Sequence, residues 1–183
     1  DNQAIIVVGD VDVNHIEDQI KKLFSGIKVP ANAAKVVPVE VADNDTAIYV
    51  VDKDKEMQAD IFQIYMKHDA YPDSLKNGMQ YLMVSYMNDV VSSMLDDRLS
   101  EKAQDSDCPF LEAGSSVGNF LISDTKGAFS LYGAGKPGKA KEAYAAILRE
   151  AKRMADYGFT ATEYQRAKAN FMSGIETALS NKD

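Results

Sequence analysis

The chain has 183 residues, of which 45% are hydrophobic and 26% charged, a composition typical of a folded domain with an apolar core. Lys and Arg number 20 against 28 Asp and Glu, a net charge of −8. This balance argues against nucleic acid or an anionic membrane as a partner, because phosphate contacts need clustered Lys and Arg. A single cysteine excludes an internal disulfide and a multi-cysteine zinc site. No apolar run reaches the roughly 18–20 residues of a membrane span.

Both ends of the sequence look cut from a longer polypeptide. The chain begins Asp1-Asn2-Gln3 without an initiator methionine or a signal peptide, and it stops at Asn181-Lys182-Asp183 directly after a helical pattern. We therefore expect residues 1–183 to form a single αβ domain that is one piece of a multi-domain parent.

A strand and a helix are expected first. The continuous apolar run Ala4–Val8 is typical of a strand buried on both faces. Asn14 and Glu17 then predict a capping box at the start of an amphipathic helix. Residues 28–45 follow as an extended connector, with a further strand expected over Val36–Val41.

Two strand pairs are expected beyond the connector. Thr46–Val51 is rich in β-formers and Ala59–Lys67 alternates between apolar and polar residues, so these two segments predict a hairpin. Phe110–Phe120 and Ala128–Gly133 predict a second hairpin in the same way.

Three helices are expected around these strands. The longest covers residues 74–102, and its segment 75–95 is apolar enough to be buried by the sheet or by a neighbouring domain. The next covers Lys139–Tyr157, with Gly158 as its left-handed cap. The last begins at the capping box Thr160–Glu163.

The order of the elements predicts the fold class. Strands come in adjacent pairs and helices fall between the pairs, so the class is α+β. We expect a mainly antiparallel sheet with the helices packed on one face and Ala4–Val8 near its middle.

The most conspicuous motif is the glycine-rich stretch Gly133–Lys139, which satisfies G-x-G-x-x-G between an expected strand and an expected helix. Such a loop can bind phosphate at a helix N-terminus. However, Ala140 stands where a Mg²⁺-binding hydroxyl would be, and no later strands follow to complete a nucleotide-binding sheet. We interpret the stretch as a strand-to-helix turn, with an anion or nucleotide site as the alternative.

No other pattern supplies catalytic chemistry. His15 and His68 lie far apart and form neither H-E-x-x-H nor H-x-x-E-H. Cys108 has no identifiable histidine partner and is interpreted as a small apolar filler, and Ser115 lies outside a G-x-S-x-G elbow. The acidic turn Asp52–Glu56 lacks the glycine and the final acid of a calcium loop. We therefore predict no catalytic, cofactor-binding or metal-ligating residue in this chain.

Three stretches carry a family resemblance: AIIVVGDVDVNHIEDQIKKLFSGI (4–27), SSMLDDRLSEKAQDSDCPFLEAGSS (92–116) and GFTATEYQRAKANF (158–171). In this order they resemble the insulinase/pitrilysin family of zinc peptidases, which includes the mitochondrial processing peptidase. The resemblance implies the α+β metallohydrolase fold of that family, with several αβ domains enclosing a chamber.

The resemblance also implies where the chemistry of the parent lies. The family binds zinc through H-x-x-E-H in its first domain, and this sequence has no such motif, so it resembles the second, non-zinc domain of a bacterial member. Residues 1–27 resemble the strand and helix that lead into that domain. The family clamps substrate with an Arg and a Tyr after the long helix, but Gln104 and Leu111, beside Phe110, align there. No substrate-binding residue is carried over.

The implied function is a non-catalytic structural domain that walls the substrate chamber of a zinc peptidase. Its partners would be the other domains of the polypeptide and, in the full-length protein, a peptide substrate; the zinc would lie in the upstream domain. Alone, the chain is predicted to be inactive and to expose an apolar patch on or beside residues 75–95. The alternatives are an inactive interaction subunit of the same family and an anion-binding domain using residues 133–139. The resemblance favours the periplasm, and the cytoplasm stays open.

Overall fold

The computed structural model describes residues 4–28, 32 and 37–182. The chain divides into two compact units, Asp1–Pro38 and Val39–Asp183. The first holds one helix, α1, and the second holds the sheet and the remaining helices.

Helix α1 spans Val13–Phe24 and begins earlier than the expected capping box. Asp12 is its N-cap, and the Asp12 carboxylate accepts the backbone N–H of His15 at 3.0 Å. Glu17 forms an i,i+4 ion pair with Lys21 on the surface. No residue of α1 is fully buried, and of its large apolar side chains only Ile16 and Ile20 are half-buried.

The expected strand Ala4–Val8 does not form. These residues have irregular backbone, and Ile6 and Val8 are 84% and 91% exposed. A β-strand needs a neighbour to pair its backbone groups, and the described residues of the first unit include no other strand. Residues 37–41 also form no strand, and Val36 lies outside the described residues.

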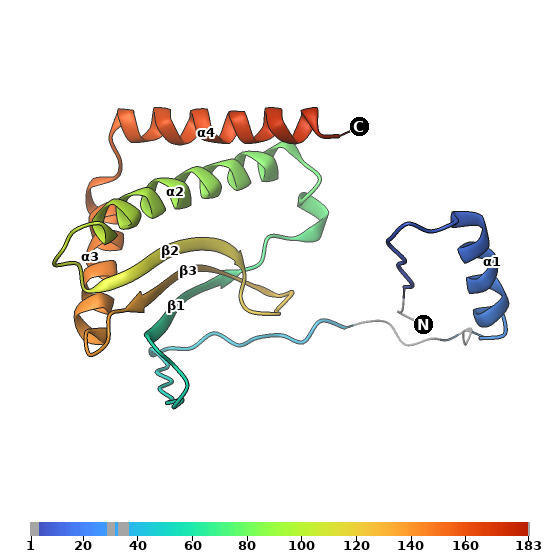
Figure 1. Cartoon of the computed structure of the whole chain (residues 1–183), viewed down its shortest axis with the longest axis horizontal. Helices are drawn as coiled ribbons and strands as arrows, with labels where there is room; N and C mark the ends of the chain where they lie inside the picture. Colours follow the sequence, from blue (N-terminus) through green and yellow to red (C-terminus); the bar gives the residue numbers. More distant parts are fainter. Residues whose placement is uncertain (1–3, 29–31, 33–36, 183) are drawn as a thin grey trace. The chain divides into compact units, whose positions relative to one another are not determined.

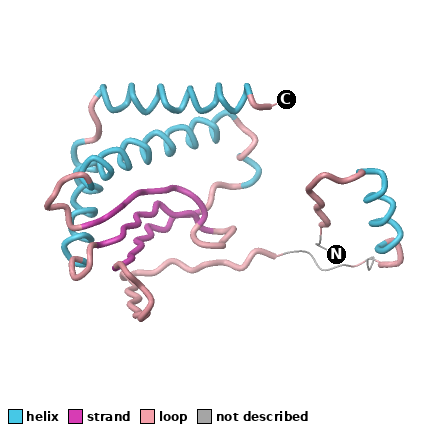
Figure 2. Tube along the Cα trace, in the orientation of Figure 1, coloured by secondary structure: helices cyan, strands magenta, loops and turns pink. Residues whose placement is uncertain are grey.

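The second unit is built on a three-stranded antiparallel sheet (Figure 2). Its strands are β1 (Asp60–Asp69), β2 (Phe110–Asn119) and β3 (Lys126–Gly135), in the spatial order β1-β3-β2. The hairpin of β2 and β3 confirms the second predicted pair, although β3 begins two residues earlier and ends two residues later than expected.

The other predicted hairpin is wrong. Residues 46–51 form exposed, irregular backbone, with Tyr49 82% and Val51 91% exposed. Strand β1 pairs with β3 along its whole length instead, in the register Ile64↔Leu131. Strand β1 is therefore paired with a strand that is distant in sequence and not with residues 46–51.

The helices of the second unit follow the expected order with one change of boundary. The long helix α2 spans Met79–Ala103 rather than 74–102. Residues Asp73–Leu75 form a separate 3₁₀ turn. Gly78 has extended backbone (ψ 158°) and is the N-cap, so α2 begins only after it. Helix α3 spans Ala140–Tyr157 and α4 spans Ala161–Ser180.

Two predicted helix caps are confirmed between α3 and α4. Gly158 is the C-cap of α3, as predicted, with φ +66° and ψ −149°, a positive-φ conformation that is extended rather than left-handed helical and that only glycine adopts without strain. Thr160 and Glu163 form the capping box, with the hydroxyl accepting the Glu163 N–H and the carboxylate accepting the Thr160 N–H.

Helices α2 and α3 lie on the same side of the sheet, and α4 packs on α2 (Figure 1). This arrangement confirms the α+β prediction of helices gathered on one face. No helix in the part of the chain that the structure describes is long and apolar enough to cross a membrane.

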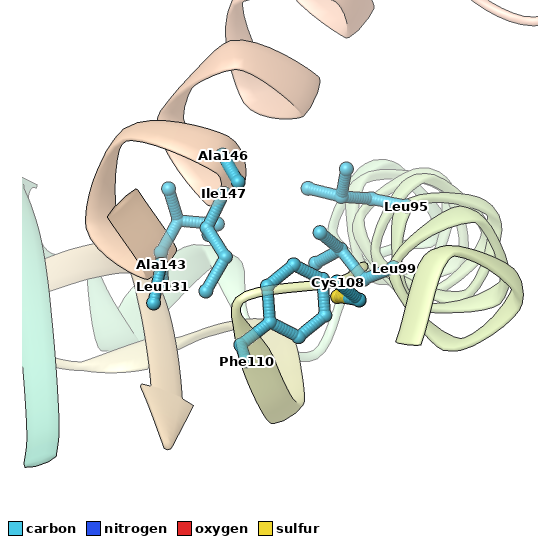
Figure 3. Close-up of a cluster of buried hydrophobic side chains, with 8 residues drawn as sticks. All are labelled: Leu95, Leu99, Cys108, Phe110, Leu131, Ala143, Ala146 and Ile147. Carbon is cyan, nitrogen blue, oxygen red and sulfur yellow. The ribbon is translucent and has the colours of Figure 1, made fainter. Parts of the chain in front are cut away.

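The core lies where α2, α3 and the sheet meet (Figure 3). Its side chains come from α2, β2, β3 and α3 and from the loop before β2, and the largest are fully buried. They are Leu95, Leu99, Cys108, Phe110, Leu131, Ala143, Ala146 and Ile147. The predicted role of the cysteine as an apolar filler is thereby confirmed.

Only the second half of α2 joins the buried interior. Val90 and Met94 are buried against Ala167 of α4. Met79 and Met83, in the first half, are 71% and 59% exposed. The sheet of this chain therefore does not bury the first half of the segment, and its exposed apolar side chains agree with the patch expected on or beside residues 75–95.

Candidate functional site

The principal cavity among the described residues lies between the first half of α2 and the end of the sheet where β1 and β2 stop and β3 begins. Its volume is about 630 Å³, within the range of sites that hold small molecules or peptide side chains. The ends of β1, β2 and β3 contribute, together with residues 70–76 after β1 and Met154 of α3. All of these elements belong to the second unit.

Apolar side chains form most of the cavity wall. Phe129 and Val117 are paired in the register of β3 and β2, so both rise from the same face of the sheet. Tyr71 and Tyr81 stand together, with ring centroids 5.2 Å apart. The apolar residues lining the cavity are Tyr71, Tyr81, Val84, Met87, Val91, Val117, Phe129 and Met154.

His68 lines the cavity at the end of β1, opposite Gly127 of β3. A Cβ at position 127 would clash with Cε1 of His68, so only glycine allows the imidazole to lie over the neighbouring strand. Nδ1 of His68 lies 2.8 Å from the carbonyl oxygen of Asp69. A carbonyl only accepts, so Nδ1 carries the proton in the neutral ring and Nε2 is left as an acceptor.

The lysines at or near the cavity are already paired, and the carboxylate of Asp89 on α2 adds a negative charge to its lining. Nζ of Lys126 lies 2.6 Å from Asp69 and 2.8 Å from Asp43. The hydrogen bonds to Asp43 and then Asp69 raise the pKa of Lys126, and the same contact lowers the pKa of the Asp43 carboxyl. Lys76 pairs with Asp73 at 2.6 Å. The cavity therefore offers no concentrated positive charge for a phosphate.

Among these residues, the sequence pointed to His68, interpreted as surface or structural, and to Met87, interpreted as part of a helical core or a partner-facing stripe. The cavity is assembled from segments of β1, α2, β2, β3 and α3 that lie far apart along the chain. No local motif connects Tyr71, Asn88 and Asn119, so no pattern in the sequence could have found the site.

The glycine-rich stretch has a packing role in the structure. Gly133 and Gly135 lie inside β3, and a Cβ at Gly133 would meet Cδ1 of Ile147 at 2.5 Å and Cζ of Phe62 at 2.7 Å. Gly138 has φ +73° in the turn that leads to α3. Side chains thus fill the space over Gly133, which supports the interpretation as a strand-to-helix turn.

This packing leads to a prediction for nucleotide binding. Millimolar ATP with Mg²⁺ should leave the melting temperature of the chain unchanged, whereas a ligand in large excess over its Kd would stabilise it by several kcal/mol. Differential scanning fluorimetry measures this directly, with Lys139→Ala as the comparison. An upward shift that disappears in the Lys139→Ala variant would establish the alternative anion site.

The remaining candidates are not among the residues that line the cavity. His15 is exposed on α1, in the other unit. Asp52 and Asp54 accept backbone N–H groups within their own exposed turn. Ser115 is buried, and its N–H and hydroxyl donate to Asp96 at 2.6 and 2.9 Å. Burial raises the pKa of the Asp96 carboxyl, which these hydrogen bonds partly offset.

Gln104 and Leu111, the positions aligned with the family's substrate clamp, lie at a helix end and on the surface. Gln104 is the C-cap of α2. Leu111 is 55% exposed, whereas its neighbour Phe110 is fully buried in the core.

A buried ion pair joins α2 to α4 on the far side of the core. Nε and Nη2 of Arg98 donate to the two carboxylate oxygens of Glu163, with the second bond at 2.9 Å. Nη2 also donates to the carbonyl of Gly158 at 3.0 Å, and the guanidinium lies 4.4 Å from the ring centroid of Phe159. The Arg98 hydrogen bonds lower the pKa of Glu163 to about 2.

The low pKa of Glu163 predicts an acid-sensitive fold. A carboxyl whose pKa is depressed on folding contributes stability above its unfolded pKa of 4.5, and this contribution is lost as the pH falls through 2. Urea unfolding at pH 4.5, 3.5 and 2.5 should show the wild-type stability falling more steeply than that of Glu163→Gln. The slopes should differ by up to one proton, about 1.4 kcal/mol per pH unit. Parallel curves would contradict this role.

The donor chemistry does not fit a zinc centre. Among the residues that the structure describes, no group of three His, Cys, Asp or Glu side chains could hold a metal ion.

Comparison with known proteins gives two kinds of match. Residues 1–171 match the family described as the peptidase M16 inactive domain. The structure resembles the periplasmic protease PqqL from Escherichia coli, with a TM-score of 0.66, 19% identity, and coverage of 95% of this chain and 19% of that one. It also resembles a predicted insulinase family protease from Yersinia pestis, with a TM-score of 0.62, 16% identity, and coverage of 96% and 37%. No curated protein matches.

Proposed function

The chain belongs to the peptidase M16 inactive-domain family, and on this premise we propose that it is a non-catalytic domain of a zinc peptidase that walls the substrate chamber. In this proposal the zinc lies in an upstream domain of the same polypeptide, and the peptide substrate contacts this domain only in the full-length protein. The chain spans about one fifth and one third of the two solved proteases it resembles, which leaves room for such domains in a longer protein.

The observation that carries the proposal is an apolar surface on α2 and α4 that the described residues of this chain leave exposed. Arg98 pairs with Glu163, and the ring of Tyr86 contacts that of Phe171, so the two helices run antiparallel. The start of α2 is therefore level with the end of α4. Large apolar side chains at both ends are about half exposed or more: Met79, Leu82, Met83, Ile175 and Leu179. We call these five residues the helix-pair patch.

The first unit supports the same interpretation. Residues 4–8 form an apolar run that pairs with no strand among the described residues, and no residue of α1 is fully buried. A unit of 38 residues cannot bury enough surface to fold stably alone. We propose that residues 1–27 are the strand and helix of an adjoining αβ domain, and that they lead into the αβ domain of this chain.

The first test concerns chemistry. The purified chain should hydrolyse no fluorogenic peptide and should retain no stoichiometric zinc after dialysis, because no described group supplies the three ligands of a catalytic site. Elemental analysis and a peptidase assay measure both. One tightly bound zinc per chain, or hydrolysis by the chain alone, would overturn the proposal.

The second test concerns assembly. If the gene encodes H-x-x-E-H upstream of residue 1, that domain, supplied as a separate polypeptide, should bind the chain and gain peptidase activity. Leu82→Asp should weaken the complex by placing a charge in the helix-pair patch, whereas Gln165→Asp, on the exposed start of α4, should not. Absence of the motif would instead indicate an inactive interaction subunit.

A further inference from the structure

We propose that the cavity beneath α2 binds one large apolar or aromatic side chain of a peptide, with the flanking peptide groups at its polar rim. This inference rests on the proposed function, since it gives the wall domain a specific contact with a peptide. It assigns a binding role to residues that no local motif of the sequence connects.

Size and wall chemistry select the occupant. A volume of about 630 Å³ exceeds a single side chain and suits one large side chain together with its neighbouring backbone. Val117 and Phe129 line the cavity from the sheet, and the neighbouring rings of Tyr71 and Tyr81 also belong to its wall. Aromatic side chains prefer to pack edge-to-face or offset against other rings, and aliphatic side chains pack on any apolar wall. Phenylalanine, tyrosine and leucine side chains therefore fit this cavity.

The polar side chains at the rim can both donate hydrogen bonds to a peptide group and accept them from it. Asn88 and Asn119 each carry a donor and an acceptor, and Nε2 of His68 is left as an acceptor by the contact of Nδ1 with Asp69. A peptide group likewise offers one N–H and one C=O. An amide-bearing ligand can therefore form hydrogen bonds with all three side chains.

The charges argue against anionic ligands. Lys126 is shared between Asp43 and Asp69, and Lys76 is held by Asp73. A phosphate or carboxylate would have to break these pairs and would then face their carboxylates. The cavity therefore favours an uncharged side chain over a nucleotide.

The experiment compares two blocked tripeptides on the full chain, acetyl-Ala-Phe-Ala-amide and acetyl-Ala-Ala-Ala-amide, by NMR titration. We expect the phenylalanine peptide to bind at least tenfold more tightly, because it alone buries a large apolar side chain. The perturbed resonances should cluster on Tyr71, Tyr81 and Phe129. Equal affinities, or shifts that cluster outside the cavity, would overturn the inference.

Matched variants locate the binding. Ser85→Trp places an indole in the cavity lining on α2 and should weaken the phenylalanine peptide at least tenfold, whereas Ser173→Trp, on exposed α4, should leave its Kd unchanged. If Ser85→Trp fails to fold, the shift map of the wild type decides alone. ADP is the anionic probe, and tighter binding of ADP in the cavity would reject the peptide assignment.

The outcomes are separable from those of the proposed function. Peptide binding is measured on the chain without any zinc-bearing domain, and assembly is measured without the tripeptide. Failure of the titration with successful assembly would reject only the cavity assignment. Failure of assembly with successful titration would reject only the wall function.

Discussion

Replacing Phe110 with alanine should lower the free energy of unfolding by about 3–5 kcal/mol, because it empties the centre of the core. Phe110 is fully buried and packs among Leu95, Leu99 and Ile147. The remaining side chains are held by helices and strands that cannot close fully over the space. In a chain of this length the loss corresponds to a fall in melting temperature of roughly 6–20 °C.

The neighbouring residue provides the control. Leu111→Ala removes a side chain of similar character that is 55% exposed, and its effect should stay within about 1 kcal/mol. Urea unfolding followed by circular dichroism measures both variants. Because both positions lie in the region aligned with the family's substrate clamp, equal effects would contradict the assignment of Phe110 to the core.

The second large effect is expected at the ion pair between α2 and α4. Arg98→Ala should cost about 3 kcal/mol, because it leaves the carboxylate of Glu163 largely buried without its partner. The side chains of Arg98 and Glu163 are only 12% and 18% exposed, and without Arg98 the carboxylate keeps only the N–H and hydroxyl of Thr160 as donors. The variant also loses the hydrogen bond to the carbonyl of Gly158 and the contact with Phe159.

Arg166 offers a matched comparison, since it also joins α4 to α2. It bonds to Asp97 and Glu101, but its side chain is 48% exposed, and such surface pairs contribute little. Arg166→Ala should cost less than about 1 kcal/mol. A double-mutant cycle of Arg98→Ala with Glu163→Gln isolates the pair, and a coupling energy near zero would show that the cost arises elsewhere.

Local signals in the sequence predicted the second half of the chain well. Gly158 and the Thr160–Glu163 capping box placed the turn between α3 and α4 correctly, because a glycine cap and reciprocal hydrogen bonds are satisfied within a few residues. The hairpin of β2 and β3 was also found, since its strands are joined by a short polar turn. The α+β class followed from this order of elements.

The errors concern segments whose structure depends on a distant partner. Ala4–Val8 and residues 46–51 have strand-like composition, yet neither forms a strand in the structure. Strand β1 pairs with β3 across more than 50 residues rather than with its predicted neighbour. Composition gives a segment its tendency to be extended, but only a second strand at the right distance pairs its backbone groups.

Spacing within fewer than about 30 residues was enough to identify the helices after residue 78, the antiparallel hairpin and the lack of an H-x-x-E-H motif, and three such stretches in a fixed order carried the family resemblance. Tertiary structure alone decided the strand order β1-β3-β2, the half of α2 that is buried, and the cavity formed by Tyr71, Phe129 and Asn119. These features arise from side chains brought together across the fold. Their energies come from burial and pairing between segments, which no local pattern records.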